Sequence, residues 1–473
     1  MTSVPCLSKI MRTLLTDTAD AAARATHFVQ RRSKLSGAVF VQTLVFGWLA
    51  NPQATLEQLT KVAALRKVYL TPQALDQRFT ERAAHCLLEV LNAAVQSLVH
   101  ANPVVAPLLG RFTGVYLHDS SILSLPNSLA GVWPGCGNQA TPSSQSAALK
   151  LQVRVELSSG TLDGPHLQSG RTHDKYSPHQ DMHHPMYTPL PQGALRIADL
   201  GFFSLSTLSH LDAVGVLWLT RIQGHAVVFD EAGRRFEPVE LVCQQATLQQ
   251  KEQLEREQLE KRGKRETEQL DLPVQLGASV RLPCRLIAVK VPAQVAGQRK
   301  RKLRQDAKRR GHNLSRERLR AAEWNIFATN VPQEKLSIQE ALVLARARWQ
   351  IELLFKLWKS HARIDEWRTA NPQRIMCEVY AKLLGVVIQH WLLLVSCWAD
   401  MWSEGRSMVK AAGTVRQYAL HIAAAFGKIA RLSEAIRTVQ SCIGVGCRIN
   451  KSRARPHLYQ LLLDPSLTLG ALA

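Results

Sequence analysis

Three carboxylates in this sequence are spaced so that they could form one metal site. Asp119 follows residues 115–118 and Asp199 follows residues 195–198, and both segments share the pattern apolar-x-apolar-x-Asp. Glu352 lies in residues 345–361, a stretch of good helix formers without Gly or Pro. Carboxylates are preferred ligands of Mg²⁺ and Mn²⁺, and two such ions roughly 3.5–4 Å apart support phosphodiester chemistry. We therefore predict that these three residues are metal ligands and catalytic residues.

Two cations share a helix face with Glu352. Arg348 precedes it by one helical turn and Lys359 follows it by about two, beside an apolar stripe made of Ile351, Leu354, Phe355 and Trp358. A carboxylate between two cations at the edge of a core suits a metal ion and a phosphate chain. The alternative is a solvated face with ordinary ion pairs.

The elements that would position the two Asp residues are strands. Residues 149–157 alternate between apolar and polar, and residues 214–222 form a continuous apolar run, which predicts a strand buried on both faces. Further strands are predicted at 226–229, 239–243, 280–291 and 323–331, with a possible short helix around 179–187. Asp119 and Asp199 would then end two neighbouring strands that open into one cleft.

The first 108 residues are predicted to be helical. Helices are expected at 36–50 and 55–65, and a third at 73–80 after the N-cap and Pro of Thr71-Pro72. The last two could form a helix-turn-helix that presents Gln73, Gln77 and Arg78 to a DNA major groove. The alternative is a three-helix bundle without that function.

The charge of the chain indicates a polyanionic partner. Among 473 residues, 59 Lys and Arg stand against 37 Asp and Glu, a net charge of +22. The most basic run, 299–320, begins with Arg299, Lys300, Arg301 and Lys302, and we predict that it binds the phosphate backbone of DNA. The charged segment before it, 248–270, is expected to be a solvated helix or a loop.

Several other classes of protein are not indicated. The sequence has no Walker A loop and no Rossmann glycine pattern, so no nucleotide cofactor is expected. Nine Cys without a CxxC pair fit reduced thiols in a cytoplasmic protein. The apolar run 383–398 is predicted to be a buried helix, so no membrane is expected, and the histidines at 173, 179, 183 and 184 are expected on a surface loop.

The motif around Glu352 resembles that of a known family. The motif resembles the Tyr-Arg-Glu-Lys signature of bacterial insertion-sequence transposases with a DDE site, because three residues separate Arg348 from Glu352 and six separate Glu352 from Lys359. The family's second Asp lies in an Asp-x-Gly-Phe segment, as Asp199-Leu-Gly-Phe202 does here. One position departs from the signature, because Ala345 stands where the family has Tyr. The resemblance covers most of residues 110–365.

The resemblance implies an RNase H-like α/β core with a five-stranded sheet, and cut-and-paste transposition by 3′-end cleavage and strand transfer. Two Mg²⁺ or Mn²⁺ ions per active site would serve the reaction, and a homodimer would hold terminal inverted repeats and target DNA. Arg348 and Lys359 would contact DNA phosphates, and Trp324 would stack on a flipped base unless it is a core residue.

The expected organisation has five segments. Residues 1–108 would bind the DNA ends, 109–222 and 321–370 would form the catalytic core, 223–320 a β-rich basic insertion, and 371–473 a helical region that could dimerise. Two alternatives remain open: a non-catalytic DNA-binding protein, which Ala345 favours, and a stand-alone metal-dependent nuclease.

Overall fold

The protein is a mixed α/β molecule in the computed structural model, which describes residues 2–31, 33–136, 146–257, 268–403, 405–449 and 456–467. The chain forms two compact units. The first comprises residues 1–105, 119–173 and 349–452, and the second 106–118, 174–348 and 453–473. The strands follow the order β3-β2-β1-β4-β5-β10-β9-β8-β6-β7, which is consistent with an RNase H-like core and extends the expected five strands to ten.

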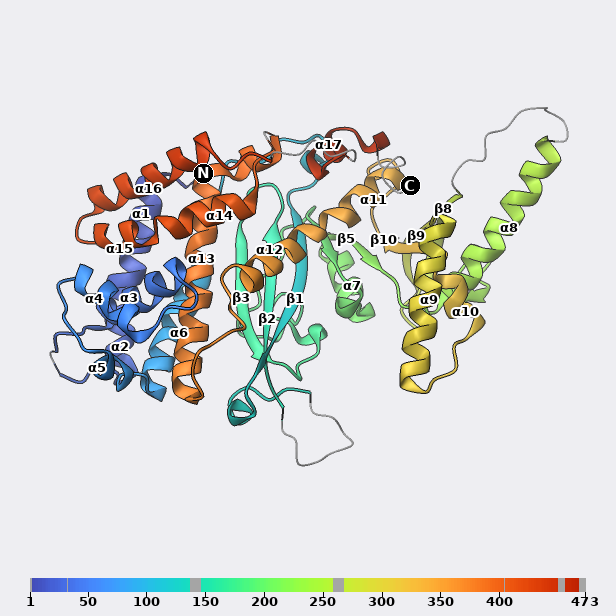
Figure 1. The fold of residues 1–473 in the computed structure, drawn as a ribbon. Coiled ribbons are helices and arrows are strands. Elements are labelled where there is room, and N and C mark those ends of the chain that lie inside the picture. The colour runs from blue at the N-terminus through green and yellow to red at the C-terminus, as the bar shows by residue number, and fades with distance from the viewer. Residues whose placement is uncertain are drawn as a thin grey trace. The chain divides into compact units, whose positions relative to one another are not determined.

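The first unit is built around one long apolar helix, α13 (Pro372–Ser403) (Figure 1). It packs against α3 (Gly37–Ala50), α6 (Glu81–Val95), α14 (Met408–Gln417) and α16 (Ile429–Val445). Its length and composition would suit a membrane span, but its most apolar window is completely buried inside the unit. The prediction of a buried helix at 383–398 is therefore confirmed. The remaining helices of this unit are α1 (Val4–Thr13), α2 (Ala19–Ala25), α4 (Leu56–Leu65), α5 (Pro72–Asp76), α12 (Trp349–Ser360) and α15 (Ala419–Ala425).

The N-terminal helices begin where the sequence predicts. Ser36 caps α3, Thr55 forms a capping box with Gln58 at the start of α4, and Thr71 caps α5 ahead of Pro72. However, α5 ends at Asp76, so the predicted helix 73–80 is only five residues long. Phe79, directly beyond it, is buried, and the chain restarts as α6 after the Thr80 cap.

The strand predicted at 149–157 is confirmed as β2 (Ala147–Glu156), which pairs antiparallel with β3 (Leu162–Ser169). Its polar residues are not on a solvated face, because Lys150, Gln152 and Arg154 are all buried. Lys150 donates to the carbonyl of Thr172 at 2.6 Å, and Arg154 pairs with Asp163 at 2.5 Å. Hydrogen-bond partners make this burial tolerable.

The second unit contains parallel strands that end beside the Asp positions. The first part of β1 (Val115–Leu125) pairs in parallel with β4 (Leu195–Ala198), and β4 pairs in parallel with β5 (Leu217–Arg221). β10 (Trp324–Thr329) lies antiparallel to β5 and to β9 (Leu282–Lys290). The strands predicted at 280–291 and 323–331 are thereby confirmed.

The inserted region is more helical than predicted. Residues 239–243 are part of a helix, α8 (Pro238–Glu257), so the strand expected there is wrong. Glu240, Gln244, Gln249 and Gln250 are exposed, and Glu and Gln are good helix formers, which outweighs the short apolar start of the segment. The predicted charged segment 248–270 lies partly outside the described residues and ends in a strand, β8 (Gln269–Leu276), which the sequence analysis missed. The basic run forms α9 (Ala293–Arg310) and α10 (Arg316–Ala321), and the insertion also includes β6 (Val228–Phe229) and β7 (Arg235–Phe236).

The remaining elements of the second unit are α7 (Leu205–Ala213), α11 (Ile338–Ala347) and α17 (Leu458–Leu463), and α17 packs on α11. The possible helix at 179–187 is absent: these described residues form turns, with a short 3₁₀ helix before them at Asp174–Tyr176. His173 and His183 are exposed as expected, but His179 is 4% exposed, with its ring 5.5 Å from that of His118.

Candidate active site

The two Asp residues directly follow a pair of matched strand residues. His118 of β1 is in register with Ala198 of β4, and Asp119 and Asp199 are the next residues in the chain. Asp119 does not end its strand as predicted, because β1 continues to Leu125. The pairing with β4 does end there, since β4 stops at Ala198 and the chain turns into a 3₁₀ helix, Leu200–Phe202.

The Asp199 carboxylate is not used by the local fold. Asp at a helix start normally accepts hydrogen bonds from backbone amides, but Asp199 makes no side-chain cap to the 3₁₀ helix that follows it. Within the described part of the chain, its carboxylate forms no hydrogen bond or ion pair either, and only its backbone carbonyl accepts one, from the amide of Phe202 at 3.0 Å. Asp119 accepts a hydrogen bond from the backbone amide of Ser120 at 2.8 Å. Half-buried carboxylates of this kind fit hard divalent metal ions.

Glu352 lies in the first turn of α12 and is half-buried. The single helix predicted over 345–361 is divided: α11 ends at Ala347, Arg348 forms a turn, and α12 begins at Trp349. The apolar stripe is confirmed, with Ile351, Leu354, Phe355 and Trp358 all buried. On the neighbouring face, Lys359 donates from Nζ to the carbonyl of Ile122 in β1 at 2.9 Å.

The end of α12 is fixed to the core of the first unit. Arg416 of α14 donates to the carbonyl of His361 at 3.1 Å. Lys382 of α13 donates to the carbonyls of Arg363 and Glu366 at 3.1 and 2.6 Å, and pairs with Glu378 at 2.8 Å. Burial lowers the pKa of Lys382 and raises that of Glu378, while their mutual attraction opposes both changes. α12 is thus anchored beyond the signature Lys.

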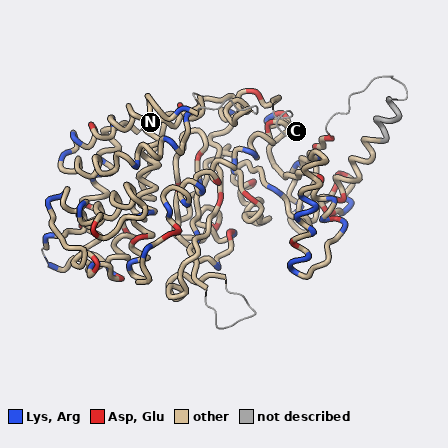
Figure 2. Tube along the Cα trace, in the orientation of Figure 1, with Lys and Arg blue, Asp and Glu red and all other residues tan. Residues whose placement is uncertain are grey.

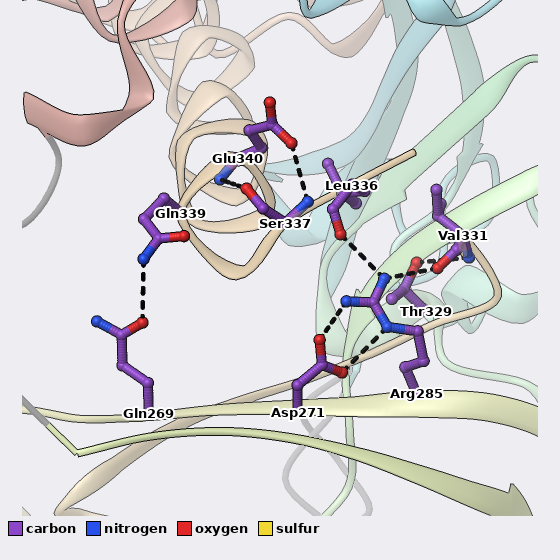
Figure 3. Close-up of polar contacts among 9 residues, drawn as sticks. All are labelled: Gln269, Asp271, Arg285, Thr329, Val331, Leu336, Ser337, Gln339 and Glu340. Atoms are coloured by element: carbon purple, nitrogen blue, oxygen red, sulfur yellow. Dashed lines mark hydrogen bonds and ion pairs between the residues drawn. The ribbon is translucent and has the colours of Figure 1, made fainter. Parts of the chain in front are cut away.

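The start of α11 is held by a network around Arg285 (Figure 3). This side chain of β9 pairs with Asp271 of β8 through two guanidinium nitrogens, and it donates to the carbonyls of Val331 and Leu336 at 2.7 and 3.0 Å. Those carbonyls lie at the two ends of the loop between β10 and α11. Ser337 then caps α11 in a capping box with Glu340 (Figure 3). The second unit thereby fixes the helix that leads to Arg348.

Comparison with known proteins identifies the family of the chain. The family model described as "Transposase DDE domain" matches residues 110–388, more than half of the chain. The chain belongs to the DDE transposase family. It is therefore an enzyme of DNA transposition, and its chemistry depends on divalent metal ions.

Two relatives match over most of their length, and a third matches over a shorter segment. The transposase is 26% identical over 390 residues to the transposase for insertion sequence element IS231F of Bacillus thuringiensis subsp. israelensis, covering 81% of this chain and 79% of the relative. It is 24% identical over 414 residues to the transposase for IS1151 of Clostridium perfringens, covering 84% and 82%. A putative transposase for IS186A of Escherichia coli is 33% identical over 111 residues, which are 24% of this chain and 30% of that relative.

The cations of the transposase that were expected to bind DNA differ in their surroundings. Arg301 and Lys302 are exposed on α9, where Lys and Arg gather in Figure 2. Arg299 instead donates to Asn325 Oδ1 at 3.0 Å and to the carbonyl of Trp324 at 3.5 Å, and Lys300 pairs with Glu323. In the first unit, Gln73, Gln77 and Arg78 are exposed, although the last two lie beyond the end of α5.

Trp324 lies in the hydrophobic core of the second unit and is 5% exposed. This burial favours the alternative that Trp324 is a core residue. To stack on a DNA base, its ring would have to leave the core. One cation was missed by the sequence analysis, namely Arg221 at the end of β5. Its signal was that it is the one charged residue in the apolar run 214–222, at the end of a strand that pairs with β4.

Proposed function

We propose that Asp119, Asp199 and Glu352 are the catalytic residues of this transposase and bind two Mg²⁺ or Mn²⁺ ions. The observation that carries the proposal is the His118–Ala198 register, because each Asp directly follows one of these paired residues. The unengaged carboxylate of Asp199 and the half-buried Glu352 of the signature helix support it further. When bound, the metal ions would supply Lewis-acid activation for phosphodiester cleavage.

The protein's own groups would orient the DNA. Arg348 and Lys359 flank Glu352 in the signature, and we assign them to phosphates at or near the cleaved bond, where guanidinium and ammonium groups neutralise charge. Lys359 would have to exchange its contact with the Ile122 carbonyl for a phosphate. A phosphate is the stronger partner for an ammonium group because it is charged.

The remaining functional assignments follow the same proposal. Residues 1–108, with Gln73, Gln77 and Arg78, would bind the terminal inverted repeats, and Arg301 and Lys302 would contact the DNA backbone. Lys300 would contribute if it left Glu323. A homodimer would hold both ends, with residues 371–473 as the candidate dimerisation region, and no nucleotide cofactor would be needed. The protein would act in the cytoplasm, on the nucleoid.

The test is cleavage and joining of DNA that carries the element's own ends, in the presence of Mg²⁺ or Mn²⁺. We expect Asp119→Asn, Asp199→Asn and Glu352→Gln each to lower the cleavage rate at least about a thousandfold, because each removes a metal ligand. DNA binding should change little. Cleavage at the wild-type rate by any of the three folded variants would contradict the assignment of that residue.

Ala345 is the observation that favours a second function, that of a non-catalytic DNA-binding protein. A copy that has lost the signature Tyr could bind DNA without cutting it. Tight, metal-independent binding of the ends without cleavage by the wild type would favour that alternative. Restoration of cleavage by Ala345→Tyr would then identify a decayed transposase. Cleavage without strand transfer would instead indicate a nuclease.

A further inference from the structure

A pocket of about 210 Å³ opens beside the end of β4 in the second unit. Its floor is formed by the last residues of β4 and β5, including Ala198 and Thr220, and by Phe327 of β10. Ala345 of α11 forms part of its wall. Ala198 directly precedes Asp199, so the pocket adjoins a proposed metal ligand along the chain.

All the charged residues that line this pocket are cations. Arg221, Arg299, Arg346 and Arg348 line it, and none of its lining residues is Asp or Glu. Arg221, Arg299 and Arg346 form no ion pair with any residue in the described ranges. Guanidinium groups stay charged in proteins, so their repulsion cannot be relieved by loss of a proton. An anion in the pocket would relieve it.

Arg299 is oriented for such a role. Its guanidinium group is held by Asn325 Oδ1 and the Trp324 carbonyl, which leaves further N–H donors for a ligand. Burial lowers the pKa of Arg299, and the positive charge of Arg221 lowers it further. The two guanidinium groups are therefore close enough to interact electrostatically. Convergent guanidinium donors fit the oxygens of a phosphate group.

Ala345 is one of the smallest side chains that line the pocket. A Tyr at this position would place a ring and a hydroxyl at the pocket wall, whereas Ala contributes one methyl group. We propose that the pocket binds one phosphate group of the DNA strand, with Arg221 and Arg299 as the main donors, and replaces the contact that the signature Tyr would have made. This inference rests on the proposed function, since it places the pocket next to the DNA being cut.

The test combines protein variants with DNA in which single phosphates are replaced by neutral methylphosphonates. The duplex carries one end of the element, and each phosphate near the cleavage site is replaced in turn. In the wild type, one position should weaken binding about tenfold or more, the loss expected for a charge-assisted contact. The variant Arg221→Gln/Arg299→Gln should bind unmodified DNA weakly and should no longer respond to replacement at that position.

A charge-matched control is Arg431→Gln/Arg437→Gln, two exposed cations of α16 in the first unit. It removes the same charge and should keep the wild-type response at every phosphate. Equal responses of the wild type and of the folded pocket variant at all positions would overturn the proposal. If the pocket variant does not fold, Ala345→Met keeps the arginines and fills the pocket, and it must then lose the response at the same phosphate.

This outcome can be separated from failure of the proposed function. If wild-type protein neither prefers the element's ends nor cuts them, the proposed function fails before any variant is compared. If it binds and cuts the ends while no single phosphate depends on Arg221 and Arg299, the proposed function stands and the pocket assignment is wrong.

Discussion

At the scale of single residues, the loop that follows the signature helix α12 is held by a buried ion pair of α13. Lys382 and Glu378 form an ion pair in which the two side chains are 2% and 3% exposed, and Lys382 also holds two carbonyls of the loop after α12. A buried pair of this kind contributes little net stability compared with apolar residues, but breaking it leaves one charge without a partner.

We expect Lys382→Met to lower the free energy of unfolding by about 3–5 kcal/mol, because Glu378 would remain buried and unpaired. The double variant Lys382→Met/Glu378→Leu should recover part of that loss. Denaturant unfolding of the three proteins measures both effects. A double variant that is less stable than Lys382→Met would contradict this, because it would show that Glu378 stabilises the fold without Lys382.

His390 makes the stability of the first unit depend on pH. Burial lowers the pKa of this imidazole from its ordinary value of 6.5 to about 4, although its Nε2–H donates to the carbonyl of Gly160 at 2.8 Å. The folded state thus favours the neutral ring. Its contribution is fully present above pH 6.5 and is lost as the pH falls toward 4, because the unfolded chain binds the proton more readily.

The expected loss in wild-type protein is about 3 kcal/mol between pH 6.5 and 4. His390→Gln keeps a donor for the Gly160 carbonyl but has no group that titrates, so its stability should fall less over the same interval. Urea unfolding at several pH values would measure the difference, and parallel pH profiles for the two proteins would contradict the assignment to His390.

At the scale of elements, the sequence predicts well where one pattern decides and poorly where two compete. The helices that start near Ser36 and Thr55, the cap at Thr71 and the apolar run of α13 are local signals, and all were predicted correctly. The start of α8 resembles a strand because the residues from Val239 to Cys243 are apolar except for Glu240. The helical pattern becomes visible only over all twenty residues of α8. The break at Arg348 has no Gly or Pro to announce it, and the backbone of Arg348 itself keeps right-handed helical angles.

The network around Arg285 also could not be predicted from local sequence, because it joins β8, β9 and the loop before α11, which are distant in sequence (Figure 3). Arg285→Met should lower the free energy of unfolding by about 2–4 kcal/mol, since it leaves Asp271 and two carbonyls without their donor. Arg285→Lys should recover little, because an ammonium group cannot reproduce the planar set of donors.

Thermal or denaturant unfolding would measure these changes, with Arg304→Gln as a control at an exposed position of α9. Strand transfer should also decline in Arg285→Met, because α11 leads directly into the signature. Stability equal to that of the wild type would mean that the network does not hold α11.

At the scale of the whole molecule, the sequence was sufficient for the family but not for the surroundings of the site residues. Asp119, Asp199 and Glu352 could be proposed as site residues because their spacing combines with a family signature. Arg221 and the pocket could not be predicted, because the pocket is lined by residues of five separate elements, β4, β5, α9, β10 and α11. Similarly, the basic run could not reveal that Lys300 pairs with Glu323 while Arg301, Lys302 and Arg304 face solvent.

The difference between the paired and the exposed cations of α9 predicts which part of the net charge of +22 contacts DNA. If exposed cations of α9 contact the DNA backbone, the variant Arg301→Gln/Lys302→Gln/Arg304→Gln should bind DNA more weakly and with a smaller dependence on salt. The slope of log K against log [salt] should decrease by about 0.9 for each phosphate contact removed. Binding of a duplex with the element's end, measured at several salt concentrations, gives this slope.

The matched control is Lys428→Gln/Arg431→Gln/Arg437→Gln, which removes three exposed cations at and along α16 and changes the net charge equally. A local contact surface on α9 requires the two slopes to differ, with the control close to the wild type. Equal flattening in both variants would mean that the positive charge acts as a diffuse field around the whole molecule. In that case the exposed cations of α9 would not contact DNA phosphates directly. The contacts would then have to come from the cations that the second unit partly buries.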